Sequence, residues 1–141
     1  MDCGTQGTKT VLRDPATGAI VAIGRAPHEL VAREDGTSEQ DPAWWIAALR
    51  IAVRDAMRSG RFEIGGIGVS GQQHGLVCLD ARDRPVRAAK LWNDTTTAGE
   101  AVELTAKLGG RDRVLELTGN LLLTGYTAPK IAWLAAHEAD A

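Results

Sequence analysis

Residues 1–9 at the amino terminus hold the side-chain types that could bind a polyphosphate. Asp2 precedes the glycine- and threonine-rich stretch Gly4-Thr5-Gln6-Gly7-Thr8, and Lys9 follows it. Small residues let backbone N–H groups turn toward an anion, an ammonium adds positive charge, and a carboxylate can hold a metal-bound water. The same residues also fit an ordinary hairpin turn, and their spacing does not fit a Walker A loop. The stretch therefore predicts a phosphate cradle only in combination with motifs further along the chain.

Two polar loops later in the chain suit a polyhydroxylated ligand. Residues 71–75 read Gly-Gln-Gln-His-Gly, and residues 92–94 read Trp-Asn-Asp. Amides and carboxylates can bridge adjacent hydroxyl groups, and an indole face can pack against the C–H side of a sugar. Other roles remain open for these residues: His74 as a structural histidine, Trp92 as a core residue, and Asp94 as a helix cap.

A hairpin and a helix are expected after the first candidate loop. Residues 8–13 and 19–24 predict two antiparallel strands around a turn over residues 14–18. Asp41-Pro42 is typical of a helix start, and apolar residues recur every four positions to Met57, which predicts a helix over 42–58. The acidic stretch 34–41 between them is expected to be a solvated loop.

The second half of the chain predicts further strands and helices. Residues 64–70 are apolar and glycine-rich, which indicates a buried central strand leading into the loop 71–75. The other expected elements are a strand over 76–79 and helices over 95–108 (capped by Asp94), 111–117 and 128–137. This order indicates α/β layering with a mixed sheet and flanking helices.

Composition excludes several classes of function. The chain has 44% apolar and 24% charged residues and a formal net charge of -2, which gives no electrostatic case for nucleic acid or an anionic membrane. Cys3 and Cys78 lack metal-ligand spacing and fit a reducing compartment, so we expect a cytoplasmic protein. His28 and His137 are expected at the surface. The chain stops at Ala141 within a helical pattern, which predicts an incomplete domain.

Five motifs follow one another along the chain: Asp2-x-Gly4-Thr5-x-x-x-Lys9, Ser38-Glu39-Gln40-Asp41-Pro42-x-x-Trp45, Gly68-x-Ser70-Gly71-Gln72-Gln73-His74-Gly75, Leu91-Trp92-Asn93-Asp94, and Gly119-Asn120 to Thr127-Ala128-Pro129-Lys130-x-x-Trp133. In this order they resemble the N-terminal domain of xylulose kinases in the FGGY carbohydrate kinase family, over the whole chain. The resemblance implies an actin-like, ribonuclease-H-like α/β fold, in which two domains enclose ATP, Mg²⁺ and a sugar.

The resemblance also implies roles for individual residues. Those facing the ATP phosphates would be Asp2, Gly4, Thr5, Gln6 and Lys9, with Asp2 acting catalytically on the metal through water. Those binding D-xylulose would be Gln73 and His74, with Trp92 lining the pocket and Asn93 and Asp94 as further contacts. The apolar residues that precede the aspartate in the family's first strand are missing here. The family's catalytic base, an aspartate in a Gly-Asp-Asn segment, has no counterpart either, so we expect the chain alone to be inactive.

Several functions stay open at this point. The first is part of a kinase that forms D-xylulose 5-phosphate, with a homodimer as one assembly of the complete protein. A kinase for gluconate, ribulose, fuculose or glycerol would share the fold. A non-enzymatic actin-like module that binds sugar or nucleotide would not need the pocket of Gln73, His74 and Trp92. A truncated product without function would expose apolar surface.

Overall fold

The structure, a computed structural model, describes residues 1–138, so the helical end expected at Ala141 lies outside the described residues. The chain forms two compact units. Unit 1 contains Met1–Leu30 and Asp41–Gln72, and unit 2 contains Val31–Gln40 and the described residues from Gln73 onward. Among the described residues, no helix combines the length and the apolar character needed to cross a bilayer.

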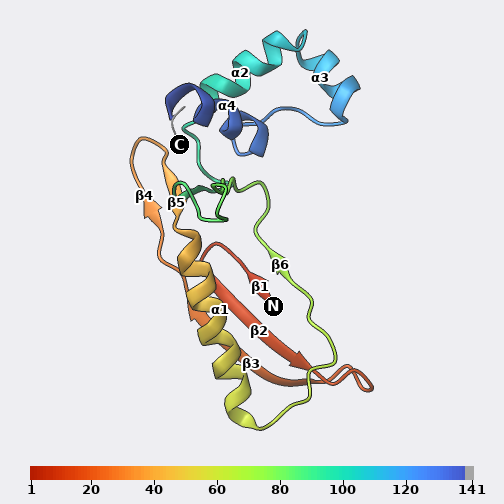
Figure 1. Ribbon diagram of the computed structural model, residues 1–141. Coiled ribbons are helices and arrows are strands. Elements are labelled where there is room, and N and C mark those ends of the chain that lie inside the picture. Colours follow the sequence, from red (N-terminus) through yellow and green to blue (C-terminus); the bar gives the residue numbers. More distant parts are fainter. Residues whose placement is uncertain (139–141) are drawn as a thin grey trace. The chain divides into compact units, whose positions relative to one another are not determined.

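Unit 1 is a mixed four-stranded sheet with one helix against it (Figure 1). The predicted hairpin is confirmed, because β2 pairs with β3 in an antiparallel register. β1 is antiparallel to β2 and parallel to β6, which makes the sheet mixed. The sheet order is β3-β2-β1-β6, with β1 at Asp2–Cys3, β2 at Gly7–Arg13, β3 at Ile20–Pro27 and β6 at Ser70–Gly71.

Helix α1 (Pro42–Ala56) confirms the helix predicted over 42–58, and the chain continues from it into a 3-10 turn, η1 (Met57–Ser59). The Asp41 carboxylate caps α1 by accepting from the Ala43 N–H at 2.8 Å. The residues of α1 that are buried are alanines such as Ala52, whereas the larger apolar residues are half-buried or exposed. A Cβ at Gly24 of β3 would lie 1.9 Å from the Ala52 carbonyl oxygen, so the helix and strand backbones approach closely and only small residues fit between them.

The predicted buried strand over residues 64–70 is wrong. Only Ser70–Gly71 joins the sheet, and the side chains of Ile67 and Val69 are 73% and 77% exposed. The physical reason is that β6 is an edge strand, and within the described residues of unit 1 no element covers its outer side. The apolar sequence is suited to burial, but this unit offers it no partner.

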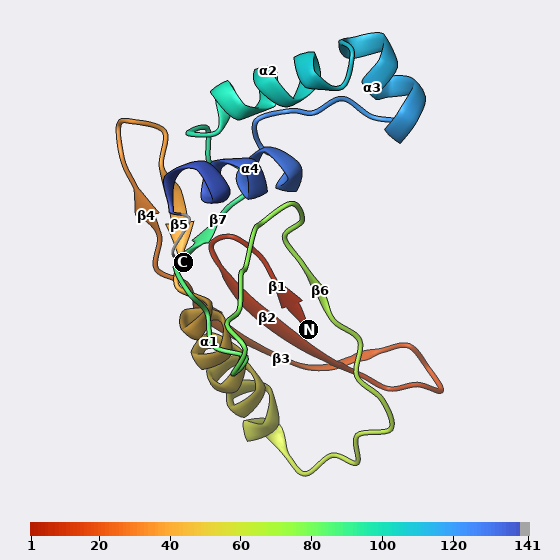
Figure 2. The same ribbon diagram turned by 45° about the horizontal axis from the view of Figure 1, so that its top comes forward.

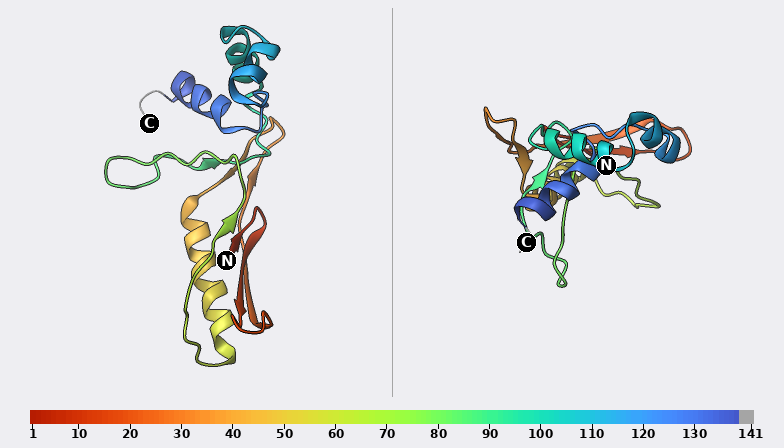
Figure 3. Two further views of the ribbon diagram at one scale, coloured as in Figure 1. Left: turned by 90° about the vertical axis from the view of Figure 1, so that its right-hand side faces the viewer. Right: turned by 90° about the horizontal axis from the view of Figure 1, so that it is seen from above.

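Unit 2 combines a small antiparallel sheet with three helices, of which α2 and α4 pack together (Figure 2). The sheet order is β4-β5-β7, with β4 at Val31–Ala32, β5 at Ser38–Gln40 and β7 at Ala89–Lys90. The helices are α2 at Ala98–Lys107, α3 at Arg111–Thr118 and α4 at Thr127–His137, close to the predicted ranges (Figure 3).

Three expectations for unit 2 fail in whole or in part. The stretch 34–41 is solvated only in part: Glu34 and Asp35 are exposed, but Ser38–Gln40 form the central strand of the sheet, β5, where Gln40 is completely buried. Residues 76–79 form isolated bridges rather than a strand. Asp94 does not cap α2, because that helix begins at Ala98 after Thr97.

Candidate functional site

The turn between β1 and β2 carries the residues expected to bind phosphates. The Gly4 N–H donates to the Gly7 carbonyl at 3.0 Å, and the register places Asp2 opposite Lys9. Cross-strand partners point to the same face of a sheet. Thr10, one position away from Lys9 in the alternation, lies opposite Gly24 and is buried toward α1. The exposed side chains of Asp2 and Lys9 therefore share the face that points away from this helix.

Arg25 is a cation near this turn that the sequence reasoning missed. It lies directly opposite Lys9 in the β2–β3 pair, so Asp2, Lys9 and Arg25 form a row across three strands. Lys9 and Arg25 also line a shallow hollow of about 300 Å³ together with Gln6. The second strand was predicted over residues 19–24 and so stopped before Arg25, and the register shift between Leu12 and Arg13 has no local sequence signal, so the predicted hairpin did not indicate this pairing.

Polar contacts support the turn from within unit 1. The Thr8 hydroxyl and Nε2 of His28 share a hydrogen bond of 2.8 Å, and burial lowers the pKa of His28, so its imidazole is neutral at pH 7. His28 is therefore half-buried rather than at the surface as expected. The Thr5 hydroxyl donates to Oε1 of Gln72 at 3.2 Å, which ties the turn to the end of β6.

In unit 2, His74 presents an exposed imidazole on a constrained backbone. Its φ of 59° lies in the left-handed region, which non-glycine residues seldom adopt. The imidazole stacks on the Tyr126 ring with 4.3 Å between centroids and 13° between planes. Gln73 is likewise exposed. Sequence reasoning missed Tyr126, since nothing in the pattern indicates that the residue before α4 meets the loop 73–75.

Lys130 lies behind this stack, completely buried. Its Nζ donates to the carbonyl oxygens of His74 at 2.8 Å and Tyr126 at 3.5 Å, and also to that of Gly125. Burial lowers the pKa of Lys130 to about 8, although the charge of Asp94 opposes this shift. The ammonium is therefore still largely charged at pH 7.

The segment Trp92-Asn93-Asp94 divides into exposed and buried residues. Trp92 is 51% exposed, which argues against a core role, and the exposed Asn93 accepts from the Ser38 hydroxyl at 2.9 Å. Asp94 is completely buried. Its carboxylate accepts from the Ser38 N–H at 2.9 Å, from Nζ of Lys90 at 3.4 Å and from the N–H and hydroxyl of Thr96. Because these donors occupy both oxygens, Asp94 supports the loop rather than offering a ligand contact.

Electrostatics agree with that supporting role. Burial by itself would raise the pKa of Asp94, but the hydrogen bonds from Ser38 and Thr96 and the charge of Lys90 outweigh it and lower the pKa. Lys90 is itself buried and pairs with Glu39 at 3.2 Å. The loop that presents Trp92 therefore rests on a buried ion-pair network.

The exposed candidates of unit 2 are linked through one close backbone contact. A Cβ at Gly125 would lie 2.3 Å from the Trp92 carbonyl oxygen. The next residue is Tyr126, whose ring stacks on the imidazole of His74. Unit 2 thus exposes Gln73, His74, Trp92 and Asn93 on two loops, both of which contact the segment Gly125-Tyr126. The candidates for phosphate binding, Asp2 to Lys9, all belong to unit 1.

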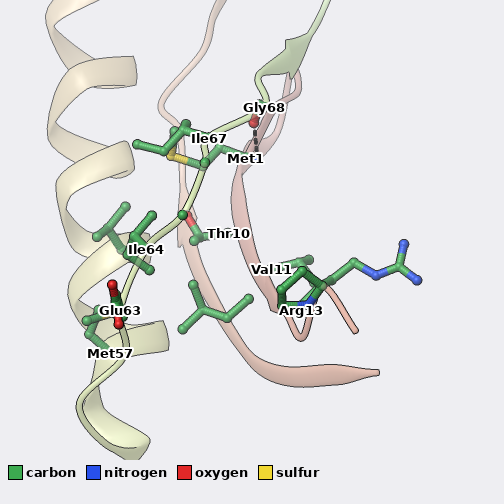
Figure 4. A pocket seen from close by; sticks show the side chains of 14 residues that line it. Met1, Thr10, Val11, Arg13, Met57, Glu63, Ile64, Ile67 and Gly68 are labelled. Atoms are coloured by element: carbon green, nitrogen blue, oxygen red, sulfur yellow. Dashed lines mark hydrogen bonds between the residues drawn. The ribbon is translucent and has the colours of Figure 1, made fainter. Parts of the chain in front are cut away.

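A hollow of about 700 Å³ in unit 1 contains none of these candidates (Figure 4). It lies between α1, β2 and the segment 63–68, and is lined mainly by apolar side chains such as Met57, Ile64 and Ile67. The Met1 amino group donates to the Gly68 carbonyl at 2.7 Å along one edge. Its polar side chains are those of Thr10, Arg13 and Glu63, none of which belongs to a candidate motif, and we place no chemistry in it.

Comparison with known proteins establishes the family. The model for the N-terminal domain of the FGGY family of carbohydrate kinases matches residues 1–141. The chain belongs to this family. It is 47% identical to a xylulose kinase of Haemophilus influenzae over 99% of the chain and 30% of that relative, and 44% identical to a xylulose kinase of Streptomyces coelicolor over 100% of the chain and 29% of that relative. The chain thus spans less than a third of their length.

Solved structures agree with this FGGY domain. The crystal structure of xylulose kinase from Bifidobacterium adolescentis matches with a TM-score of 0.89 and 32% identity, over 99% of this chain and 29% of that one. Plasmodium falciparum glycerol kinase, solved with ADP, matches with a TM-score of 0.89 and 25% identity, over 99% of this chain and 28% of that one. The fold is the actin-like, ribonuclease-H-like α/β class that the motifs predict.

Proposed function

We propose that this FGGY chain is the N-terminal part of a longer kinase that transfers the γ-phosphoryl group of ATP to D-xylulose, forming D-xylulose 5-phosphate. The xylulose kinases that it resembles are more than three times its length. The observation that carries the proposal is the exposed imidazole of His74, stacked on Tyr126 in the unit that also exposes Trp92. Such groups suit a small polyol, because they combine hydrogen bonding with an aromatic face.

In this proposal the sugar is held by unit 2. Gln73 and Asn93 supply amide groups, His74 supplies an imidazole, and Trp92 offers an indole face to the C–H side of the sugar. Asp94 is left out of the contacts because its oxygens are already engaged. Holding the reacting hydroxyl in place is one of the two main contributions that a protein makes to phosphoryl transfer, beside stabilisation of charge.

The ATP phosphates are proposed to lie against the β1–β2 turn. The residues concerned are Gly4, Thr5, Gln6 and Lys9, with the carboxylate of Asp2 as the metal-side group. Within residues 1–138, no three His, Cys, Asp or Glu side chains gather to hold a metal. Mg²⁺ fits nevertheless, because it commonly binds to one carboxylate, substrate phosphates and waters. When bound, Mg²⁺ would neutralise phosphate charge.

Turnover by the complete protein tests this proposal. We expect it to phosphorylate D-xylulose in preference to gluconate, ribulose, fuculose and glycerol in an ATP-coupled assay. The 141-residue chain alone is expected to give no sugar-dependent turnover, because it contains no counterpart of the family's catalytic aspartate. Equal or better use of another sugar would replace D-xylulose with that substrate. The similarity to a glycerol kinase makes glycerol the most useful comparison.

His74→Ala in the complete protein tests the sugar site. We expect kcat/KM for D-xylulose to fall by about tenfold or more, as for loss of a polar contact, while the KM for ATP changes less than about twofold. His137→Ala is the matched control, because His137 lies at the far end of α4 and stacks on Trp133. An equal loss in both variants would remove His74 from the sugar site.

Composition bears on where the complete protein works and what it meets there. The net charge and composition support a cytoplasmic enzyme without a nucleic-acid or membrane partner. A homodimer is the assembly to test first, by light scattering of the complete protein.

A further inference from the structure

The position of Lys130 is unusual for a lysine. It lies in the first turn of α4, where the helix dipole disfavours a cation, and its side chain is completely buried. Lysine is among the residues least often buried without a partner. Within the described residues, no carboxylate forms an ion pair with its Nζ, which contacts backbone carbonyls instead. Burial and the nearby helix N-terminus both disfavour the charged ammonium, so we expect its contacts with these carbonyls to stabilise the surrounding loops.

The three carbonyls that Lys130 contacts belong to the two segments that form the aromatic stack. An ammonium has three N–H donors, and these match the carbonyl oxygens of His74, Gly125 and Tyr126. The carbonyl of His74 follows a left-handed φ, so its direction is tied to a backbone conformation that costs about 1 kcal/mol or more. The Nζ of Lys130 donates to this carbonyl oxygen at 2.8 Å and so stabilises the conformation.

We propose that Lys130 is a positioning residue for the sugar site: its ammonium ties the backbone of His74 to that of Gly125 and Tyr126, and so fixes the imidazole of His74 on the Tyr126 ring. Gly125 also touches the Trp92 backbone, so the same tie reaches the second loop of the site. This inference rests on the proposed sugar-binding role of His74. Lys130 itself is buried and touches no substrate.

A double-mutant cycle separates positioning from general stability. In the complete protein at pH 7, Lys130→Met is expected to raise the KM for D-xylulose about tenfold and to change the KM for ATP less than twofold. In the His74→Ala background, the same substitution is expected to change the KM for D-xylulose less than twofold. Val114→Ala is the control. Val114 is fully buried in α3, which contributes no residue to the proposed sugar site, so this substitution should lower Tm without changing the KM for D-xylulose. Equal effects of Lys130→Met in both backgrounds would overturn the proposal.

A spectroscopic measurement is independent of turnover. The 141-residue chain has three histidines, so in its proton NMR spectrum the ring signals of His74 can be assigned by comparison with His74→Ala. Because the imidazole faces the Tyr126 ring, its protons should be shifted upfield by the ring current, and Lys130→Met should remove that shift. The signals of His28, which lies in unit 1, should stay unchanged. A retained shift in Lys130→Met would overturn the proposal.

The two experiments distinguish the failure of each idea. If the complete protein phosphorylates none of the sugars, the proposed function fails, and the ring shift still decides whether Lys130 holds the imidazole. If Lys130→Met does not fold, Lys130→Gln, which retains a shorter and uncharged donor, is measured in both assays with the same criteria.

Discussion

At the scale of single residues, buried charges hold the exposed ligand candidates in place. Trp92 and Asn93 are exposed, and the residue that follows them, Asp94, is completely buried against Lys90. Sequence reasoning could select this segment, but it could not tell which of its residues are exposed ligand candidates and which one is a buried support. A supporting residue differs from a ligand contact in its burial and in the number of hydrogen bonds that it already accepts. For Asp94 these bonds come from Ser38 and Thr96, and the sequence does not indicate that either residue meets it.

Asp94→Asn should therefore destabilise unit 2. An amide at this position cannot accept from all the donors that meet the Asp94 carboxylate, and the buried Lys90 loses one of its carboxylate partners while keeping Glu39, so we expect a loss of about 3 kcal/mol in the free energy of unfolding. Urea denaturation of the chain measures it. Glu103→Gln is the control, because the Glu103–Lys107 pair is exposed and its loss should cost less than about 0.5 kcal/mol.

The same pair of proteins gives a pH dependence with a defined sign. The pKa of Asp94 is lowered in the folded state, so its stabilising effect is present above the unfolded pKa of about 3.9 and is lost as the pH falls through the folded value. The difference in unfolding free energy between wild type and Asp94→Asn should accordingly shrink below about pH 4. A difference that stays constant from pH 6 to pH 3 would contradict this account.

At the scale of elements, local signals predicted the helices and the hairpin, and failed for the strands with non-local partners. Asp41 and Pro42 indicate the start of α1 because capping acts within one turn. Residues 64–70 carry the composition of a buried strand, but burial depends on a neighbour that the local sequence does not name. For the same reason β5 was mistaken for a loop: its polar residues are buried by pairing with β4 and β7.

Gly24 shows how the packing of α1 on β3 depends on one missing side chain. Gly24→Ala would place a Cβ 1.9 Å from the Ala52 carbonyl oxygen, so the helix must shift. We expect a loss of about 2 kcal/mol in the free energy of unfolding, as for overpacking in a core. Gly65→Ala, in the same unit and with nothing within 4 Å of the added Cβ, should change it by less than about 0.5 kcal/mol. Equal urea midpoints for the two variants would contradict the close approach.

At the scale of the whole molecule, unit 1 leaves an apolar segment at its sheet edge exposed. Ile64, Ile67 and Val69 are all about half exposed or more, and the first two line the apolar hollow beside Met57 (Figure 4). Contiguous apolar patches of this kind normally mark surfaces that meet another protein segment. The motifs select the ligand candidates from the sequence, whereas this apolar surface is identified only from the position of β6 at the sheet edge.

The 141-residue chain should therefore bind a hydrophobic dye such as anilinonaphthalene sulfonate while it is still folded. The combined change Ile67→Lys and Val69→Lys should lower the dye fluorescence by at least about half, because it places two charges on the exposed segment next to the hollow. Val102→Lys is the matched control: Val102 is 71% exposed on α2, in unit 2, so its replacement should leave the fluorescence nearly unchanged. Circular dichroism of each variant checks that the fold is retained. A folded wild-type chain that binds no dye would show that the segment 64–69 is covered in solution, by its own rearrangement or by a second copy, and light scattering would separate these two cases.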